Sequence, residues 1–134
     1  MMTNYEKVQH FNALVAQLKE SAGLEPTSIN TQMKLITEEY HEVINALFDW
    51  ENSSASEVYN TQLALQKELL DLLYVTYGLL SMFKGNVDAG FDAVHTNNMN
   101  KFNGATFRED GKLIKPEGFV KMTDEDLARA LYDQ

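Results

Sequence analysis

The chain has 134 residues, of which 44% are hydrophobic, and it contains no cysteine. This length predicts one domain with enough apolar side chains for a core, and the absence of cysteine excludes a disulfide framework, a zinc–thiolate site and a cysteine nucleophile. The net charge of −9 argues against a nucleic-acid surface, which needs patches of Lys and Arg, and suits recruitment of Mg²⁺ or of a substrate that arrives with Mg²⁺.

Helical spacing of apolar residues predicts four helices in succession. The first covers residues 4–22 and ends at Gly23. The second begins after Ser28 as a cap and runs to about residue 50, the third covers about 57–83, and the fourth runs from about 87 to 102. Because the connections are short, we expect an all-α fold with an antiparallel four-helix bundle.

The last part of the chain, residues 104–134, changes in character. Asp110-Gly111 lies between two short β-rich runs and predicts a hairpin. Thr123 to Asp126 resembles a capping box that opens a short final helix. We therefore expect a single domain, residues 1–134, in which a bundle of residues 1–103 carries this tail as a cover for the bundle, the active site or a neighbouring subunit.

The predicted location of the protein follows from its N-terminus and its most apolar run. The N-terminus lacks the charged-then-apolar pattern of a signal sequence. Residues 69–83 are too few to span a bilayer and include Asp71. We expect a soluble protein of the cytoplasm, or of the host cytoplasm if the source is viral, with no membrane partner.

Two groups of carboxylates lie on the second and third predicted helices. Glu38, Glu39 and Glu42 form the first group, and Glu68 and Asp71 form the second. Residues three apart on a helix share a face, and the second group lies in a run so apolar that most of it must be buried. Because carboxylates are rarely buried unless they are paired or bind a metal, the two groups predict a site for hard divalent cations.

Each carboxylate group also has an ordinary explanation. The first would be a solvated acidic face, and the second would pair with Lys or Arg. Lys67 adjoins Glu68 in sequence but is expected to point elsewhere, and the 12 residues after Asp71 contain no cation. Like charges at Glu38 and Glu42 are mildly destabilising, so the two groups together favour a metal site.

Four further residues are candidate substrate contacts. Asn98 and Lys101 lie one turn apart on the fourth predicted helix, where they would hold phosphate oxygens or belong to an ordinary polar face. Trp50 is a core or interface residue, or it stacks on a nucleobase. Lys34, one turn before Glu38, contacts substrate or pairs with that glutamate.

A rival metal site is a di-iron carboxylate bundle, in which two helices each supply Glu-x-x-His and two others each supply a Glu. Glu38-x-x-His41 and Asp92-x-x-His95, with Glu68, partly imitate that pattern. The second motif begins with Asp, however, the first helix lacks a clear partner Glu at its middle, and Glu42 and Asp71 would have no role.

Glu38-Glu39-Tyr40-His41-Glu42, followed after about 25 residues by Glu68-Leu69-Leu70-Asp71, resembles the motif of the MazG-like all-α nucleoside triphosphate pyrophosphohydrolases. That superfamily includes dimeric dUTPases and phosphoribosyl-ATP pyrophosphatases. Residues 97–102 and 110–119 are similar to its phosphoribosyl-ATP-pyrophosphohydrolase-like and phage branch. The resemblance covers about residues 5–119.

The resemblance implies hydrolysis of an NTP or dNTP to the monophosphate and diphosphate with Mg²⁺ or Mn²⁺. It implies that Glu38 orients the water or binds a second metal, and that Asn98 and Lys101 contact sugar or phosphates. It also implies a homo-oligomer, a dimer or tetramer, in agreement with a third helix that is apolar nearly all round. The implied metal ligands are Glu39, Glu42, Glu68 and Asp71.

The nucleobase is the least determined feature. Some phage members of the family that resemble this chain act on purine dNTPs, particularly dGTP and dATP, and these are the expected substrates. A dCTP- or dUTP-directed enzyme is the next choice. Phosphoribosyl-ATP is less expected, because the acidic chain shows no extra basic cluster for another phosphate. From a different class, the alternative is the di-iron bundle without nucleotide chemistry.

Overall fold

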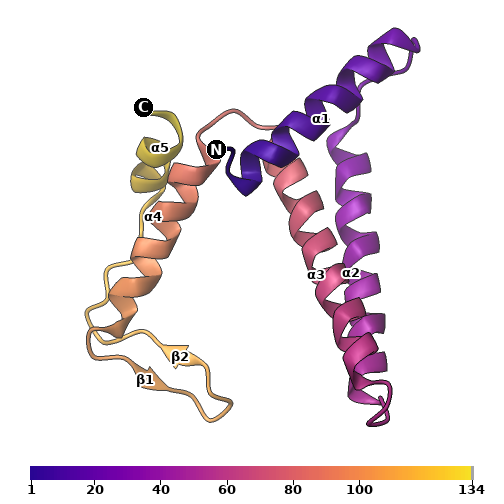
Figure 1. Cartoon of the computed structure of the whole chain (residues 1–134). Helices are drawn as coiled ribbons and strands as arrows, with labels where there is room; N and C mark the ends of the chain where they lie inside the picture. Colours follow the sequence, from indigo (N-terminus) through magenta and orange to yellow (C-terminus); the bar gives the residue numbers. More distant parts are fainter. Residues whose placement is uncertain (134) are drawn as a thin grey trace. The chain divides into compact units, whose positions relative to one another are not determined.

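The computed structural model describes residues 1–133, and its helices confirm the predicted all-α bundle class (Figure 1). The helices lie close to their predicted bounds, and the predicted hairpin is present as a short antiparallel ladder. No helix among these residues is both long and apolar enough to cross a membrane. The elements are α1 Asn4–Ser21, α2 Ile29–Glu51, α3 Val58–Leu80, α4 Val87–Met99, a 3-10 turn Asn100–Phe102, β1 Thr106–Phe107, β2 Leu113–Ile114 and α5 Asp124–Tyr132.

Side-chain caps define where the helices begin. The first N–H groups of a helix have no partner within it, and Ser, Thr or Asp side chains satisfy them. Ser28 Oγ accepts from the backbone N–H of Thr31 at 3.0 Å, as predicted for α2. Thr123 and Asp126 bond reciprocally, side chain to backbone N–H, at 3.1 Å in both directions. The capping box predicted for α5 is therefore confirmed.

Residues 1–83 form one compact unit built on the pairing of α2 with α3. The two helices run side by side along their length, and α1 packs against α3 (Figure 1). Aromatic rings join α1 to α3, with centroid distances of 5.8 Å for Tyr5 and Tyr77 and 5.6 Å for Phe11 and Tyr74. Edge-on and tilted ring pairs stabilise such contacts beyond their buried area. This unit therefore holds α2 and α3 in a defined register.

A buried hydrogen bond lies between α2 and α3. Gln32 of α2 is only 7% exposed, and its Nε2 donates to the carbonyl oxygen of Val75 at 2.9 Å. A Cβ on Gly78 would lie 2.5 Å from that Nε2 and 3.2 Å from Asn12 Nδ2. The glycine thus provides the space in which the amide of Gln32 reaches the backbone of α3.

Residues 84–133 form the second described unit, in which α4 packs on α5. A Cβ on Gly90 would lie 2.7 Å from Leu131 Cδ2, so the two helices approach closely at this glycine. The backbone N–H of Asn86 also donates to the carbonyl of Leu131 at 2.7 Å. The compact units divide after Phe83, and α4 packs with the tail helix α5. The single domain of residues 1–134, with a bundle of residues 1–103 and a tail, stays a prediction.

Substituting Gly78 by Ala is expected to destabilise the unit of residues 1–83. Overpacking a filled site costs about 1–3 kcal/mol, which outweighs the gain of about 1 kcal/mol from replacing a helical Gly by Ala, since the new methyl group displaces the amide of Gln32. Urea unfolding would measure the change in the free energy of unfolding. Thr76→Ala, at an exposed position of the same helix, is the control, and a Gly78→Ala protein as stable as that control would contradict this packing.

Candidate metal centre

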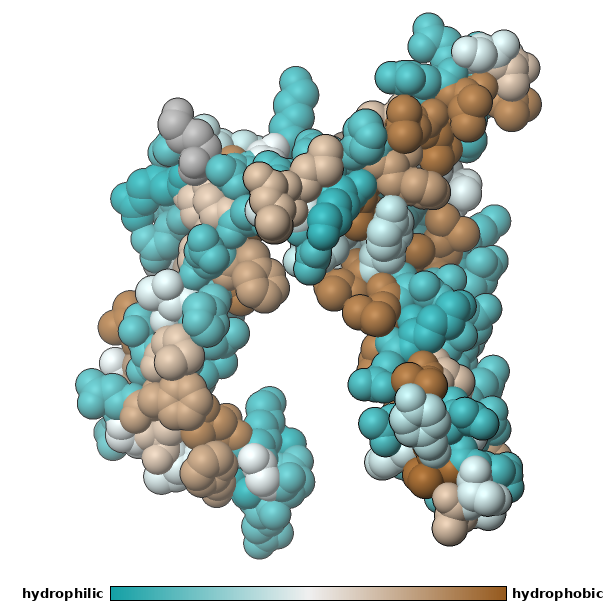
Figure 2. All heavy atoms as spheres, in the orientation of Figure 1, coloured by the Kyte–Doolittle hydropathy of each residue, from teal (hydrophilic) through white to brown (hydrophobic). Residues whose placement is uncertain are grey.

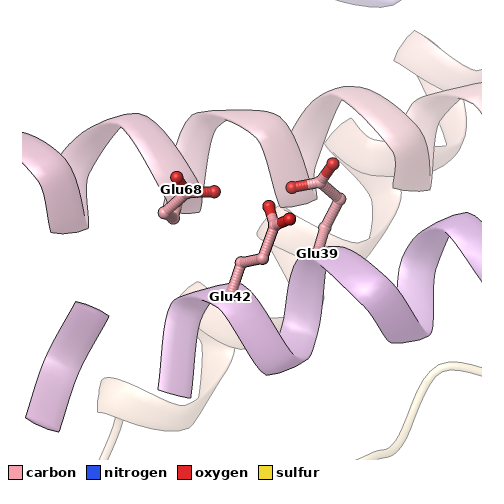
Figure 3. A group of neighbouring side chains, drawn as sticks. All are labelled: Glu39, Glu42 and Glu68. Carbon is pink, nitrogen blue, oxygen red and sulfur yellow. The ribbon is translucent and has the colours of Figure 1, made fainter. Parts of the chain in front are cut away.

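Three of the predicted metal ligands meet between α2 and α3. Glu39 and Glu42 project from the same face of α2 because they are three residues apart, and Glu68 faces them from α3 (Figure 3). One carboxylate oxygen from each of the three lies within 4.8 Å of the others. The pairing of α2 with α3 therefore converts two separate sequence motifs into one cluster of oxygen donors.

The cluster contains two buried oxygen atoms that the described residues leave unsatisfied. Glu39 Oε2 and Glu68 Oε2 are both buried, and neither has a hydrogen-bond partner in the part of the chain that the structure describes. Burying a carboxylate oxygen without a partner is costly. A divalent cation bound by oxygen ligands, such as Mg²⁺ or Mn²⁺, would satisfy both atoms, so the residues present fit a metal.

Crowding of the carboxyl groups changes the protonation of Glu68. Its hydrogen bond with the carboxyl group of Glu42 raises the pKa of Glu68 above its ordinary value, and burial raises it further, against the lowering effect of Lys67. A carboxyl group with a raised pKa retains its proton more readily beside another negative charge. The metal-free cluster thus carries repulsion that a cation would relieve.

Lys67 corrects one expectation from the sequence. Its Nζ lies 2.8 Å from Asp71 Oδ2 and 3.7 Å from Glu68 Oε1, so the expectation that it points elsewhere is wrong. Residues four apart on a helix are neighbours, and a long flexible lysine also reaches the residue beside it. The same contact raises the pKa of Lys67, chiefly through its hydrogen bond with Asp71.

Asp71 lies outside the cluster of three and is held in this ion pair. It is one turn from Glu68 on α3, and its side chain is 38% exposed. Ion pairs this exposed contribute little, about 0–1 kcal/mol, so Lys67 is a weak competitor for the carboxylate. The role of Asp71 as a fourth metal ligand stays a prediction.

The other predicted site residues lie outside the cluster. Glu38 is exposed on the turn that carries Glu39, and Lys34 makes no ion pair with it among residues 1–133. Trp50 is 38% exposed near the end of α2. Asn98 and Lys101 belong to the unit of residues 84–133, so their contact with substrate stays a prediction.

The rival di-iron site receives no support from the cluster. In the described chain, the group of side chains placed to hold a metal contains three glutamates and no histidine. His41 lies beside Tyr40, with ring centroids 6.0 Å apart. A set of oxygen donors alone suits Mg²⁺ or Mn²⁺, whereas the di-iron site also requires imidazole ligands.

Comparison with known proteins identifies the family. Residues 8–98 match the family described as phosphoribosyl-ATP pyrophosphohydrolase. The chain belongs to this family. The match spans both acidic motifs and places the chain in the MazG-like all-α superfamily, as predicted, so the protein is a pyrophosphohydrolase of the MazG-like type. A search of curated proteins finds no match to this chain.

Sequence reasoning missed two features of the described residues. The first is the ion pair of Lys67 with Asp71, which the spacing of four residues signalled. The second is a cavity in the C-terminal unit that four cationic side chains line, among them Lys101. Its residues are spread over 15 positions of the sequence, so no compact run of basic residues marked it.

Glu42→Gln is expected to stabilise the metal-free protein at pH 7. The pKa of Glu68 is raised in the folded state above its ordinary value of 4.5, so its contribution to stability is fully present below about pH 4.5 and is lost as the pH rises through the folded pKa. The substitution removes the carboxyl group that is the largest cause of that rise. The gain in melting temperature should therefore be seen at pH 7 and vanish near pH 4.

The matched control is Glu51→Gln, which removes a charge from the same helix at its C-terminal end. Thermal unfolding of both variants and of the wild type in EDTA, at pH 4 and pH 7, makes the comparison. If Glu42→Gln melts below Glu51→Gln at pH 7, the three glutamates do not repel one another in the folded protein.

Proposed function

We propose that this pyrophosphohydrolase acts on nucleoside triphosphates, with Mg²⁺ or Mn²⁺, to release the monophosphate and diphosphate. The observation that carries the proposal is the pair of buried, unpartnered oxygens of Glu39 and Glu68 beside Glu42, among the residues that the structure describes. Hydrolysis of a triphosphate needs charge neutralisation and positioning more than a protein nucleophile. A carboxylate cluster that fits a divalent cation supports this chemistry.

Each acidic residue has a proposed task. Glu39, Glu42 and Glu68 would hold the metal, which when bound neutralises phosphate oxygens and lowers the pKa of a bound water. Asp71 would join them once its carboxylate leaves Lys67. Glu38, exposed and next to Glu39 in sequence, would orient the attacking water or bind a second metal.

For the substrate, we propose a purine dNTP, dGTP or dATP, on the resemblance to the phage branch, with dCTP and dUTP as the pyrimidine alternative. Asn98 and Lys101 would contact sugar or phosphates, Lys34 would contact phosphates, and Trp50, 38% exposed, would stack on the base. Each of these contacts rests on residue type and on the family resemblance.

Phosphoribosyl-ATP is a second candidate substrate, favoured by a cationic cavity and by the name of the matched family. The sequence argument against it was the absence of an extra basic cluster, and that argument is wrong, because four cationic side chains line one cavity. An additional phosphate requires additional positive charge. The family matched by residues 8–98 also carries the name of this substrate.

We also propose that the enzyme assembles as a homo-oligomer, a dimer or a tetramer. Large apolar side chains of α2 and α3 stay exposed in the single chain, among them Phe48 at 64% and Leu70 at 65%. Only five hydrophobic side chains are buried among the described residues. Figure 2 shows apolar side chains at the surface. An exposed apolar face of this kind is typical of a surface that a second copy covers.

Activity should require the metal and the cluster. With each dNTP, each NTP and phosphoribosyl-ATP in Mg²⁺ or Mn²⁺, we expect diphosphate and not orthophosphate as the released product, and no turnover in excess EDTA. Glu39→Gln should lower kcat/KM by at least about 100-fold, since even residues that only support metal ligands are worth about 10–100-fold. Glu51→Gln should retain wild-type kinetics. Undiminished turnover in EDTA, or orthophosphate as product, would contradict the proposal.

The oligomer is tested by light scattering of the wild type at micromolar concentration. A mass of two or four chains of 15.2 kDa is expected. Leu70→Glu places a charge on the exposed apolar face of α3 and should shift the mass toward the monomer, because burying an unpaired charge in an interface is costly. Gln62→Glu, at an exposed polar position of the same helix, is the control. A monomeric wild type refutes the assembly.

A further inference from the structure

The C-terminal unit carries a local excess of positive charge in an acidic protein. Between residues 101 and 115 there are four cations, against the two acids Glu109 and Asp110, although the whole chain has a net charge of −9. A local excess of positive charge in a chain of negative net charge points to an anionic partner.

The hairpin gathers these cations. Phe107 pairs with Leu113 in the ladder, and the backbone N–H of Arg108 donates to the carbonyl of Lys112 at 2.8 Å. Gly111, at φ +87°, provides the left-handed residue that this turn requires. The two strands thus hold Arg108 and Lys112 opposite each other.

The cations line one cavity of about 440 Å³, a volume within the usual range for small-molecule sites of about 300–1,000 Å³. The cavity lies wholly within the C-terminal unit. Figure 2 shows hydrophilic atoms gathered at the hairpin end of this unit. The residues that line the cavity are Lys101, Arg108, Lys112, Leu113, Ile114 and Lys115.

One of the four charges is neutralised within the hairpin. The guanidinium of Arg108 donates to both carboxylate oxygens of Asp110, through Nε at 2.8 Å and Nη2 at 2.5 Å. The same carboxylate accepts from the backbone N–H of Lys112 at 3.2 Å. These contacts lower the pKa of Asp110, chiefly the hydrogen bond from Arg108. Arg108 and Asp110 therefore act as a neutral pair that fixes the turn.

The three lysines remain without a carboxylate. Within residues 1–133, no Asp or Glu oxygen lies within 4 Å of the ammonium group of Lys101, Lys112 or Lys115. Lys101 is half-buried, and its Nζ lies 6.0 Å from the centroid of the Phe119 ring. Such a cation–π contact orients an ammonium group without neutralising it. The cavity is thus a site of uncompensated positive charge with at least one ordered donor.

We propose that this cavity binds the phosphate chain of a polyphosphate anion, with Lys112 and Lys115 as phosphate contacts in addition to Lys101. Ammonium groups act as point charges for phosphate oxygens, and an anion would relieve the repulsion among the three lysines. This inference rests on the proposed function for its source of anion, either the triphosphate of the substrate or the diphosphate product. Phosphoribosyl-ATP would use the same charges for its additional phosphate.

The test is binding in EDTA, where the glutamate cluster cannot contribute through a metal. Sodium diphosphate, sodium phosphate and dATP are titrated separately into the full chain, followed by calorimetry and by the amide NMR spectrum. We expect diphosphate or dATP to bind and to shift amide signals of residues 101–119. The variant Lys112→Gln/Lys115→Gln should bind at least about 10-fold more weakly, since losing two charge-assisted contacts removes at least one tenfold step.

The matched control is Lys84→Gln/Lys121→Gln, which removes the same net charge from two exposed lysines of the same unit outside the cavity. It should bind as the wild type does. Diphosphate bound at least as tightly as dATP identifies the product as the source of the anion, and tighter dATP identifies the substrate. Far-UV circular dichroism and the dispersion of the amide spectrum verify that both variants are folded.

Three results would overturn the inference. These are no binding of either polyphosphate to the wild type, equal binding of orthophosphate and diphosphate, and equal losses in the cavity and control variants. The last two would show general attraction to positive charge. Hydrolysis is not part of this test, so the two proposals can fail separately. Binding through the lysines without any turnover would support the cavity as a polyphosphate site and refute the proposed function. Turnover without binding through the lysines would support the proposed function and refute the cavity as a polyphosphate site.

Discussion

The pairing of α2 with α3 is the contact on which the metal centre depends. It places Glu68 within 4.8 Å of Glu39 and Glu42, although like charges oppose this approach. Packing around the buried Val43 and Ala46 and the contact of Gln32 with the backbone of α3 oppose the repulsion. The helices are thus held together by features away from the carboxylates. This leaves the glutamates available for a cation, because the fold does not need them to pair within the chain.

An excess of one sign of charge marks each proposed site. The unit of residues 1–83 concentrates negative charge at three glutamates, and the unit of residues 84–133 concentrates positive charge at three lysines. Oxygen donors of the first suit a divalent cation, and ammonium groups of the second suit phosphate oxygens. Under the two proposals, each unit retains a charge arrangement that a ligand of opposite charge would relieve.

Lys67 shows how weak contacts complicate the identification of a site. Its ion pair with Asp71 has the geometry of an ordinary salt bridge, and by itself it would assign Asp71 to a structural role. Exposed pairs of this kind contribute little to stability, whereas the buried oxygens of Glu39 and Glu68 have no partner among the described residues. Unsatisfied buried atoms therefore carry more information about function here than satisfied exposed ones.

The sequence by itself determined the features that depend on local periodicity. Helical spacing identified the helices and the shared face of Glu39 and Glu42, and capping residues located the starts of α2 and α5, because these contacts join residues at most four apart. The acidic motifs also identified the superfamily. The tertiary structure alone decided that Glu68 meets the pair on α2, that α4 packs with the tail and that Lys101 shares a cavity with the hairpin. Contacts between elements, and the direction of a flexible side chain such as Lys67, depend on packing that spacing along the chain does not specify.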